Sequence, residues 1–326
     1  MMPDNSTAKC PVAVVGAGTM GAGIAQIFAQ AGHPVRLQAR KRETLEAALR
    51  RVRVNQDELI RHELIAAVDA EAARGRITVT QDLKEALAGA AFVSENIPER
   101  LDLKQPLFAE LDRITPPETI LSTNTSSLPI TQVARDTKHP ERVVGFHWFN
   151  PPHLIPLVEV IRGDRTADAT MDETYRLARA IGKSPIRVQK DIPGFVGNRL
   201  QRALEREFFY LERIGACSGA DLEVALKQGL GFRWSVVGPL EHADLAGVDT
   251  HAATVALLFP LLSNDTAPPP LFANLAAQGR LGAKTGGGVY EYGPGDVERI
   301  LARRNTMLID FIKVLRKHPS LRDPSE

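Results

Sequence analysis

Residues 12–21 decide the fold, and they read VAVVGAGTMG. Four apolar residues predict a short buried strand, and the G-x-G-x-x-G spacing predicts a tight turn into a helix over residues 21–31. The glycines permit the turn and let the backbone approach a pyrophosphate, to which the helix N-terminus offers free N–H groups. A purely structural turn is the alternative. The predicted cofactor contacts in this stretch are Gly16, Gly18, Thr19, Met20 and Gly21.

Strand-like and helix-like runs alternate along the first half of the chain. A second strand-like run, residues 35–38, follows the first helix, and residues 44–68 form a helical region with a charged face. Further strand-like runs lie at residues 77–80, 92–94, 119–122, 143–146, 157–161 and 186–188. Such alternation is typical of an α/β fold with a mostly parallel sheet covered on both faces. We therefore predict an N-terminal Rossmann-like, doubly wound sheet.

The pattern changes at residues 191–194, where Pro and Gly interrupt the chain. Residues 195–261 carry helical periodicity, and no strand series follows Val188. We predict that residues 9–190 form the dinucleotide-binding domain and that residues 191–326 form an all-helical domain for substrate binding and dimerisation. The cleft between two such domains is a common place for a ligand.

Composition narrows the classes of function. The 326 residues include 40 Lys and Arg against 39 Asp and Glu, so nothing indicates nucleic acid or an anionic membrane as a partner. Cys10 and Cys217 match no metal-ligand spacing, and we predict no metal site. The N-terminal segment lacks the apolar core of a signal peptide, and no apolar run reaches the roughly 18–20 residues that span a bilayer. We expect a cytoplasmic protein.

The end of the second strand-like run bears on the choice of cofactor. Folds that prefer NAD place Asp or Glu there to bind the ribose hydroxyls of adenosine. This chain has Ala39, followed by the basic residues Arg40, Lys41 and Arg42. Without a carboxylate to repel it, a 2′-phosphate can bind Arg40 through two hydrogen bonds. We expect NADP in preference to NAD, and a solvated basic loop is the alternative.

Four further segments extend the pattern: NTSS at residues 124–127, HWFNP at 147–151, LVEV at 157–160 and PGFVGNR at 193–199. Together with the glycine stretch, and in this order and spacing, they resemble the L-3-hydroxyacyl-CoA dehydrogenase family. The resemblance runs from residue 11 to residue 292 and covers both predicted domains. It implies a nicotinamide-dependent dehydrogenase that interconverts a 3-hydroxy acyl compound and its 3-keto form.

The resemblance also implies roles for single residues. His147 is the general base that takes the proton of the C3 hydroxyl, which suits a side-chain type with an ordinary pKa of about 6.5. Glu159 holds the imidazole tautomer, while Ser126 and Asn198 hydrogen-bond the substrate oxygen. Asn150 supports the same site. The further cofactor contacts that the resemblance implies are Glu99, Lys104 and Asn124.

These residues also have structural alternatives. A lone histidine in an apolar segment is more often a satisfied core residue than a catalyst. A carboxylate on the apolar run that holds Glu159 is costly without a partner, and this cost favours pairing with His147. Turn, cap or surface-pair roles are the alternatives for Ser126, Asn198, Glu99 and Lys104.

Several segments depart from the acyl-CoA members and favour a smaller substrate. Pro156 stands where those members have a basic residue, and residues 150–159 look more like the L-gulonate 3-dehydrogenase (lambda-crystallin) and carnitine dehydrogenase branches. Arg233, expected in a loop that faces the cleft, can clamp a free carboxylate, and Trp234 can close the pocket. A surface position is the alternative for Arg233. Residues 282–290 keep the terminal motif of the acyl-CoA members.

We therefore favour a small free 3-hydroxy acid as the substrate. The alternative is an L-3-hydroxyacyl-CoA such as 3-hydroxybutyryl-CoA, with a place in fatty acid metabolism. A cofactor-binding structural protein without turnover, like a crystallin, is a further alternative, and the intact set of catalytic residues argues against it. The resemblance also implies a homodimer, for which the apolar face around Phe208, Phe209 and residues 257–259 can serve.

Overall fold

The computed structural model describes residues 9–318. Within them the chain divides into two compact units. The first unit contains residues 9–198 together with Asn305–Lys313, and the second contains Arg199–Arg304 and residues 314–318. A part of the last helix therefore belongs to the first unit, although more than a hundred residues separate it from the rest of that unit.

The first unit is built on an eight-stranded sheet in the order β3-β2-β1-β4-β5-β6-β7-β8. Strands β1 to β6 run parallel, β7 is antiparallel to β6, and β8 is parallel to β7. The strands are β1 (Val12–Val15), β2 (Val35–Gln38), β3 (Ile77–Thr80), β4 (Phe92–Glu95), β5 (Ile120–Thr123), β6 (Val143–Trp148), β7 (Leu157–Ile161) and β8 (Ser184–Val188). The order of the parallel strands is that of a dinucleotide-binding sheet, so the predicted fold is confirmed.

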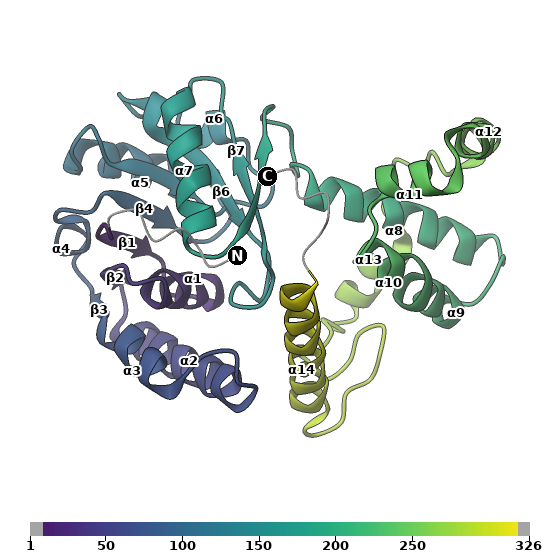
Figure 1. Ribbon diagram of the computed structural model, residues 1–326, viewed down its shortest axis with the longest axis horizontal. Helices are drawn as coiled ribbons and strands as arrows, with labels where there is room; N and C mark the ends of the chain where they lie inside the picture. Colours follow the sequence, from purple (N-terminus) through teal and green to yellow (C-terminus); the bar gives the residue numbers. More distant parts are fainter. Residues whose placement is uncertain (1–8, 319–326) are drawn as a thin grey trace. The chain divides into compact units, whose positions relative to one another are not determined.

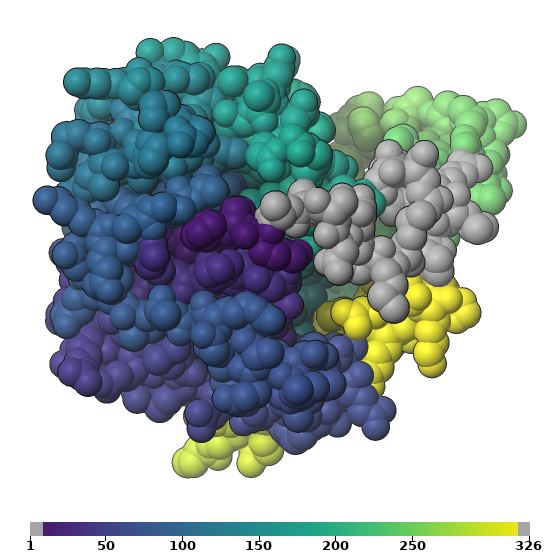
Figure 2. Space-filling model, turned by 60° about the vertical axis from the view of Figure 1, so that its left-hand side comes forward, coloured from purple at the N-terminus to yellow at the C-terminus, as the bar shows by residue number. Residues whose placement is uncertain are grey.

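Helices cover both faces of this sheet (Figure 1). On β1, Val12 and Val14 belong to one buried cluster and Ala13 and Val15 to another, because successive side chains of a strand point to opposite faces. The first cluster includes residues of α1 (Thr19–Gln30), α2 (Arg42–Arg61), α3 (Ala67–Gly75) and α7 (Asp168–Ala180). The second includes residues of α4 (Leu83–Leu87), α5 (Leu101–Ile114) and α6 (Ile130–Val133). Figure 2 shows residues of this unit, coloured from purple to teal, on one face of the molecule.

The helical region predicted over residues 44–68 is divided into two helices. Helix α2 ends at Arg61, and α3 begins at Ala67. Between them Glu63 has a φ of +57°, a left-handed conformation that an α-helix cannot contain. The break turns the chain back and lets α3 pack against α1 and α2.

The described part of the second unit is helical, as predicted. Its elements are α8 (Gly197–Arg213), α9 (Gly219–Val224), η2 (Ala225–Leu230), α10 (Gly231–Trp234), α11 (Pro239–Ala246), α12 (Val248–Leu258), η3 (Phe259–Leu261), α13 (Pro270–Ala277) and α14 (Asp296–Lys317), with the start of α8 and the middle of α14 in the first unit. The loop expected around Arg233 and Trp234 is wrong, because both residues lie in α10 at the end of a helical stretch. Gly231 keeps right-handed helical angles there, since glycine permits a turn without enforcing one.

Helix α14 anchors its middle in the first unit. Ile309 is fully buried in a small cluster with Leu59 and Leu154, and Asn305 Nδ2 donates to Glu58 Oε2 at 2.8 Å. Among the described helices, none combines the length and the apolar character that a membrane crossing needs. Residues 9–318 contain no group of three or more His, Cys, Asp or Glu side chains placed to hold a metal ion.

Candidate active site

His147 and Glu159 face each other across two antiparallel strands. They are direct partners in the register of β6 and β7, and His147 Nδ1 lies 2.6 Å from Glu159 Oε2. Both residues are buried. The connection over residues 149–156 turns the chain back between the strands, which explains how residues twelve apart in the sequence meet. The contact predicted from the sequence is therefore present.

The second oxygen of the Glu159 carboxylate is held by backbone. Glu159 Oε1 accepts hydrogen bonds from the N–H groups of Val196 and Gly197, both at 2.9 Å, at the start of α8. Burial raises the pKa of Glu159, but the hydrogen bonds from His147 and the backbone outweigh it and hold that pKa below its ordinary value. An ionised carboxylate only accepts, so Nδ1 of His147 carries a proton and donates it to Glu159. In the neutral form of the imidazole, this tautomer places the lone pair on the other ring nitrogen, Nε2.

Aromatic side chains fix the orientation of the imidazole. The ring of His147 lies 4.6 Å from the ring of Phe149 and 5.9 Å from that of Phe195, measured between centroids. Phe149 in turn leaves no room beside Gly197, where an added Cβ would lie 2.6 Å from the phenyl ring. With the ring packed and Nδ1 bound, Nε2 is positioned as a general base.

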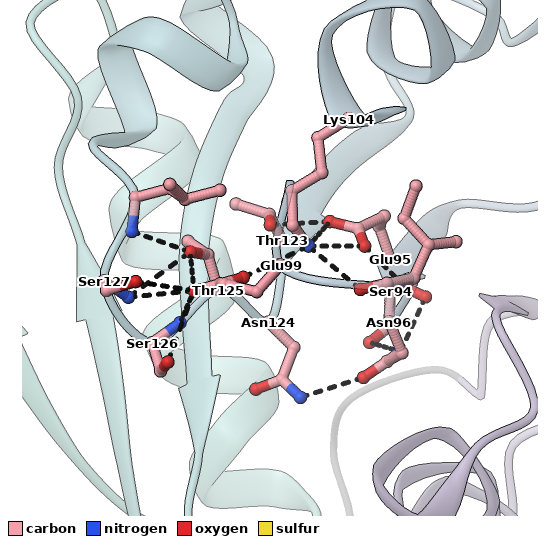
Figure 3. Close-up of polar contacts among 12 residues, drawn as sticks. Ser94, Glu95, Asn96, Glu99, Lys104, Thr123, Asn124, Thr125, Ser126 and Ser127 are labelled. Atoms are coloured by element: carbon pink, nitrogen blue, oxygen red, sulfur yellow. Dashed lines mark hydrogen bonds and ion pairs between the residues drawn. The ribbon is translucent and has the colours of Figure 1, made fainter. Parts of the chain in front are cut away.

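Ser126 lies in a turn after β5 that is held by a single carboxylate oxygen. Glu99 Oε1 accepts from the N–H of Ser126 at 2.8 Å and of Ser127 at 3.0 Å, and from the hydroxyls of Thr125, Ser126 and Ser127 (Figure 3). Burial raises the pKa of Glu99, but these hydrogen bonds and the nearby charge of Lys104 hold it below its ordinary value. Glu99 thus stabilises the conformation of the turn that presents Ser126.

Lys104 pairs with a carboxylate that sequence reasoning missed. Its Nζ donates to Glu95 Oε1 at 2.7 Å and Oε2 at 2.8 Å and lies 3.6 Å from Glu99 Oε2, with only 1% of its side chain exposed (Figure 3). Glu95 also accepts from the hydroxyl of Thr123 and the N–H of Ile97, both at 2.6 Å. The feature of the sequence that could have identified Glu95 is a glutamate at the end of the apolar strand β4, at the edge of the sheet where β5 also ends.

Two asparagines link these groups to the histidine strand. Asn124 accepts from the N–H of Trp148 at 2.9 Å and donates to Asn96 Oδ1 at 3.0 Å. Asn198 donates from Nδ2 to the carbonyl oxygen of Ser126 at 3.0 Å. The structure therefore brings Ser126 and Asn198 together. Asn150 lies exposed directly after β6.

The glycine turn fits the pyrophosphate of a dinucleotide. Gly16 has a φ of +100°, and a Cβ there would lie 2.6 Å from the carbonyl oxygen of Asn96. A Cβ on Gly21 would lie 1.8 Å from the carbonyl oxygen of Gly16, whereas one on Gly18 would meet no atom within 4 Å. No side chain caps the N-terminus of α1 at Gly18, which leaves its N–H groups for an anion. Thr19 is exposed beside this open side, and Met20 is half-buried.

The remaining predicted residues take no part in the hydrogen bonds described above. Arg40 is exposed after β2, and within residues 9–318 its guanidinium makes no hydrogen bond or ion pair. Arg233 and Trp234 are exposed on α10 and belong to the second unit, whereas every other predicted site residue belongs to the first. Sequence reasoning treated residues 191–194 only as a boundary. In the structure the carboxylate of Asp191 accepts from the first N–H groups of α6, at 2.9 and 2.7 Å.

Comparison with known proteins identifies the family. The NAD binding domain model of 3-hydroxyacyl-CoA dehydrogenase matches residues 11–192, and the C-terminal domain model of the same family matches residues 194–292. The 5-formyl-3-hydroxy-2-methylpyridine 4-carboxylate 5-dehydrogenase of Mesorhizobium japonicum is 35% identical over 93% of this chain and 97% of its own. L-carnitine dehydrogenase of Streptomyces griseus is 40% identical over 72% of this chain and 69% of its own.

A solved structure agrees with these matches. The crystal structure of a 5-formyl-3-hydroxy-2-methylpyridine 4-carboxylic acid 5-dehydrogenase, described as an NAD⁺-dependent dismutase, has a TM-score of 0.88 and 33% identity, and the match covers 95% of this chain and 99% of that one. Together the two family models match residues of both units described above, and the match to this structure covers nearly the whole chain. The chain therefore belongs to the 3-hydroxyacyl-CoA dehydrogenase family of nicotinamide-dependent oxidoreductases.

Proposed function

We propose that this dehydrogenase interconverts a small free 3-hydroxy acid and its 3-keto acid, with His147 as the general base. The single observation that carries the proposal is the pairing of His147 Nδ1 with Glu159 Oε2 at 2.6 Å. Two backbone N–H groups hold the other oxygen of this buried carboxylate. For packing alone, a neutral residue would serve at a lower desolvation free energy, so the carboxylate indicates a role in the chemistry.

The mechanism follows from the groups around the histidine. The glycine turn from Gly16 to Gly21 and the N-terminus of α1 would hold the pyrophosphate of a nicotinamide cofactor, which would accept or supply the hydride. In oxidation, Nε2 of His147 takes the proton of the C3 hydroxyl, and the charge of Glu159 stabilises the imidazolium that forms. Asn198 donates a hydrogen bond to the C3 oxygen, and the hydroxyl of Ser126 does so once it turns from Glu99 to the substrate. These hydrogen bonds polarise the keto group when the reaction runs in reverse.

The preference for a free acid rests on the second unit and on relatives. Arg233 offers two parallel N–H groups to a carboxylate, and Pro156 removes a positive charge near Glu159 that a larger anionic substrate would use. The two relatives named above are called after L-carnitine and a pyridine carboxylate, and neither name includes CoA. The name of the family favours the alternative, a 3-hydroxyacyl-CoA that serves fatty acid metabolism.

We further propose that NADP is preferred to NAD and that the chain forms a homodimer. Support for NADP is the unpaired guanidinium of Arg40 and the absence of a carboxylate at Ala39. Support for the dimer is the second unit, where Leu257, Leu258 and Phe259 are all exposed. A second copy that covers this face would bury these side chains.

Initial rates of NADPH oxidation by the purified protein test the substrate and cofactor together. The panel is a series of free 3-keto acids and acetoacetyl-CoA, with NADH as the second cofactor. Turnover of free acids alone supports the proposal and makes Arg233→Ala the next variant. Fast turnover of acetoacetyl-CoA would instead establish the thioester as substrate. Binding of cofactor without turnover of any compound would favour a structural protein.

A further inference from the structure

Lys183 is a buried cation that the proposed mechanism does not use. It lies between α7 and β8, and only 8% of the residue is exposed. No carboxylate in the described part of the chain pairs with it. Its Nζ donates to the carbonyl oxygens of Pro152 at 2.5 Å and Ile155 at 2.8 Å, and it lies 5.0 Å from the centroid of the Trp148 ring.

Both carbonyls belong to the connection between the strands of the candidate site. Residues 149–156 leave β6 two residues after His147 and enter β7 two residues before Glu159. Lys183 binds this connection at two points, and the N–H of Ser184 binds the carbonyl oxygen of Pro156 at 2.9 Å. The chain around Lys183 therefore fixes three of the last five residues of the connection.

The same connection packs on the helix of the glycine turn. A Cβ on Gly23 of α1 would lie 2.5 Å from Cγ of Pro152, so the two segments are in direct contact. A displacement of Pro152 would therefore disturb both the end of β6 and the packing of α1. The carbonyl oxygen of Pro152 accepts its hydrogen bond from Lys183.

The charge of Lys183 is costly, which argues for a role beyond packing. Burial lowers the pKa of Lys183 to about 7, because the ammonium loses its hydration. Hydrogen bonds from an ammonium are roughly twice as strong as neutral ones, and the face of an indole also attracts a cation. A methionine would fill the space without the cost of desolvation, but it would leave both carbonyls without a donor.

We propose that Lys183 is a positioning residue of the active site: it clamps the connection between the strands of His147 and Glu159, and so fixes Asn150 and the imidazole toward the substrate. The proposal rests on the proposed role of His147. It assigns no contact with substrate or cofactor to Lys183. Its effect is exerted through Pro152 and Ile155.

The kinetic test compares Lys183→Met with a control of similar structural cost. Met171→Ala, in α7, removes a fully buried side chain of the first unit that belongs to the cluster under α1, α2, α3 and α7. We expect both variants to lower the midpoint of thermal unfolding. Only Lys183→Met should lower kcat, roughly 10- to 100-fold, because a small misplacement of the catalytic groups is enough for such a loss. The KM for the cofactor should change less than kcat.

Lys183→Gln is the second variant, because a neutral amide offers a donor in the same space. Partial recovery of kcat relative to Lys183→Met supports the clamp, provided that circular dichroism shows both variants folded. Unchanged kcat in both folded variants, with only a lower unfolding midpoint, overturns the proposal and leaves Lys183 a structural residue.

A spectroscopic test needs neither substrate nor cofactor. Trp234→Phe leaves Trp148 as the one tryptophan of the chain. Its emission should change with pH around 7 as the ammonium beside the ring loses its proton, and Lys183→Met should abolish this part of the change. The Lys183→Met variant serves as the reference, because histidine side chains in general titrate in the same pH range. The titratable side chains on the surrounding elements are His147, His153, Glu159, Asp168, Asp172, Glu173, Tyr175, Arg176, Arg179 and Arg187.

The two tests fail separately. A wild-type protein without activity on any free acid or thioester would contradict the proposed function, whereas the emission of Trp148 would still report whether Lys183 holds the connection. Identical pH curves with and without Lys183 would overturn the clamp even if the enzyme is active.

Discussion

The two units differ in how far they bury their own apolar residues. In the first, alternate residues of the strands fill two large clusters under the helices. In the described part of the second, Leu222, Ser263 and two glycines are the only buried residues. Large apolar side chains stay exposed there, among them Phe232, Leu240, Leu257, Phe259 and Phe272. The first unit therefore buries the His147–Glu159 pair among its own residues, whereas the second exposes apolar side chains of the kind that binding surfaces present.

The largest expected effect concerns the enclosed pair of the first unit. Glu159→Gln should lower kcat roughly 10³- to 10⁴-fold, because an amide can donate to Nδ1 and leave the proton on Nε2. Steady-state rates, together with the affinity for NADPH from its fluorescence, measure the change. The exposed Glu118→Gln is the control and should keep full activity. A loss below tenfold for Glu159→Gln would contradict the role of the pair.

The next effect concerns the exposed face of the second unit. Leu257→Asp should weaken the proposed dimer by about 10²-fold or more, because a dimer interface would bury an unpaired carboxylate. Light scattering over a range of micromolar concentrations measures the shift toward one chain. Val68→Asp, at an exposed apolar position of the first unit, is the matched control. Equal masses for both variants and the wild type would refute this face as the interface.

A smaller effect is expected for cofactor choice. Arg40→Ala should raise the KM for NADPH about tenfold or more and leave that for NADH unchanged, because a charge-assisted hydrogen bond to the 2′-phosphate is lost. Arg42→Ala is the control, since Arg42 pairs with Glu46. If the two variants behave alike, the basic residues act only as a solvated loop.

The smallest effect concerns stability toward acid. All carboxyl groups of the described residues with a lowered pKa lie in the first unit, Glu159 and Glu99 among them. Because the folded pKa of Glu159 lies below its ordinary value of 4.5, its contribution to stability is present above that pH and is lost as the pH falls through the folded pKa. The free energy of unfolding, measured with urea between pH 7 and 3.5, should fall more steeply with decreasing pH for the wild type than for Glu159→Gln. Parallel curves would contradict this assignment.

Much of the first unit was predictable because its signals are local. Short apolar runs predicted every strand, and the glycine spacing predicted the turn between β1 and α1. The break between α2 and α3 was not predictable, because Glu63 carries no sequence signal for a positive φ. Around Arg233 the opposite error arose, since the resemblance to the small-substrate branches suggested a loop where Gly229, Gly231 and Arg233 lie within a helical stretch.

Partners of charged groups were harder to predict than the groups themselves. Lys104 was singled out, but Glu95, its closest partner, was not. Lys183 and Asp191 bind backbone groups that lie about 30 and 60 residues away in the sequence. No local pattern encodes such contacts, because they depend on which strand ends and helix starts the fold brings to one edge of the sheet.

By itself, the sequence determined the class of fold, the dinucleotide turn and the identity of the residues at the candidate site. Only the tertiary structure decided which nitrogen of His147 is available, because Glu159 reaches Nδ1 while the start of α8 holds the other carboxylate oxygen. It also decided that Glu99 holds the turn of Ser126 and that Lys183 clamps the connection after His147. These assignments depend on hydrogen bonds between segments far apart in the chain, whose distances exist only once the chain is folded.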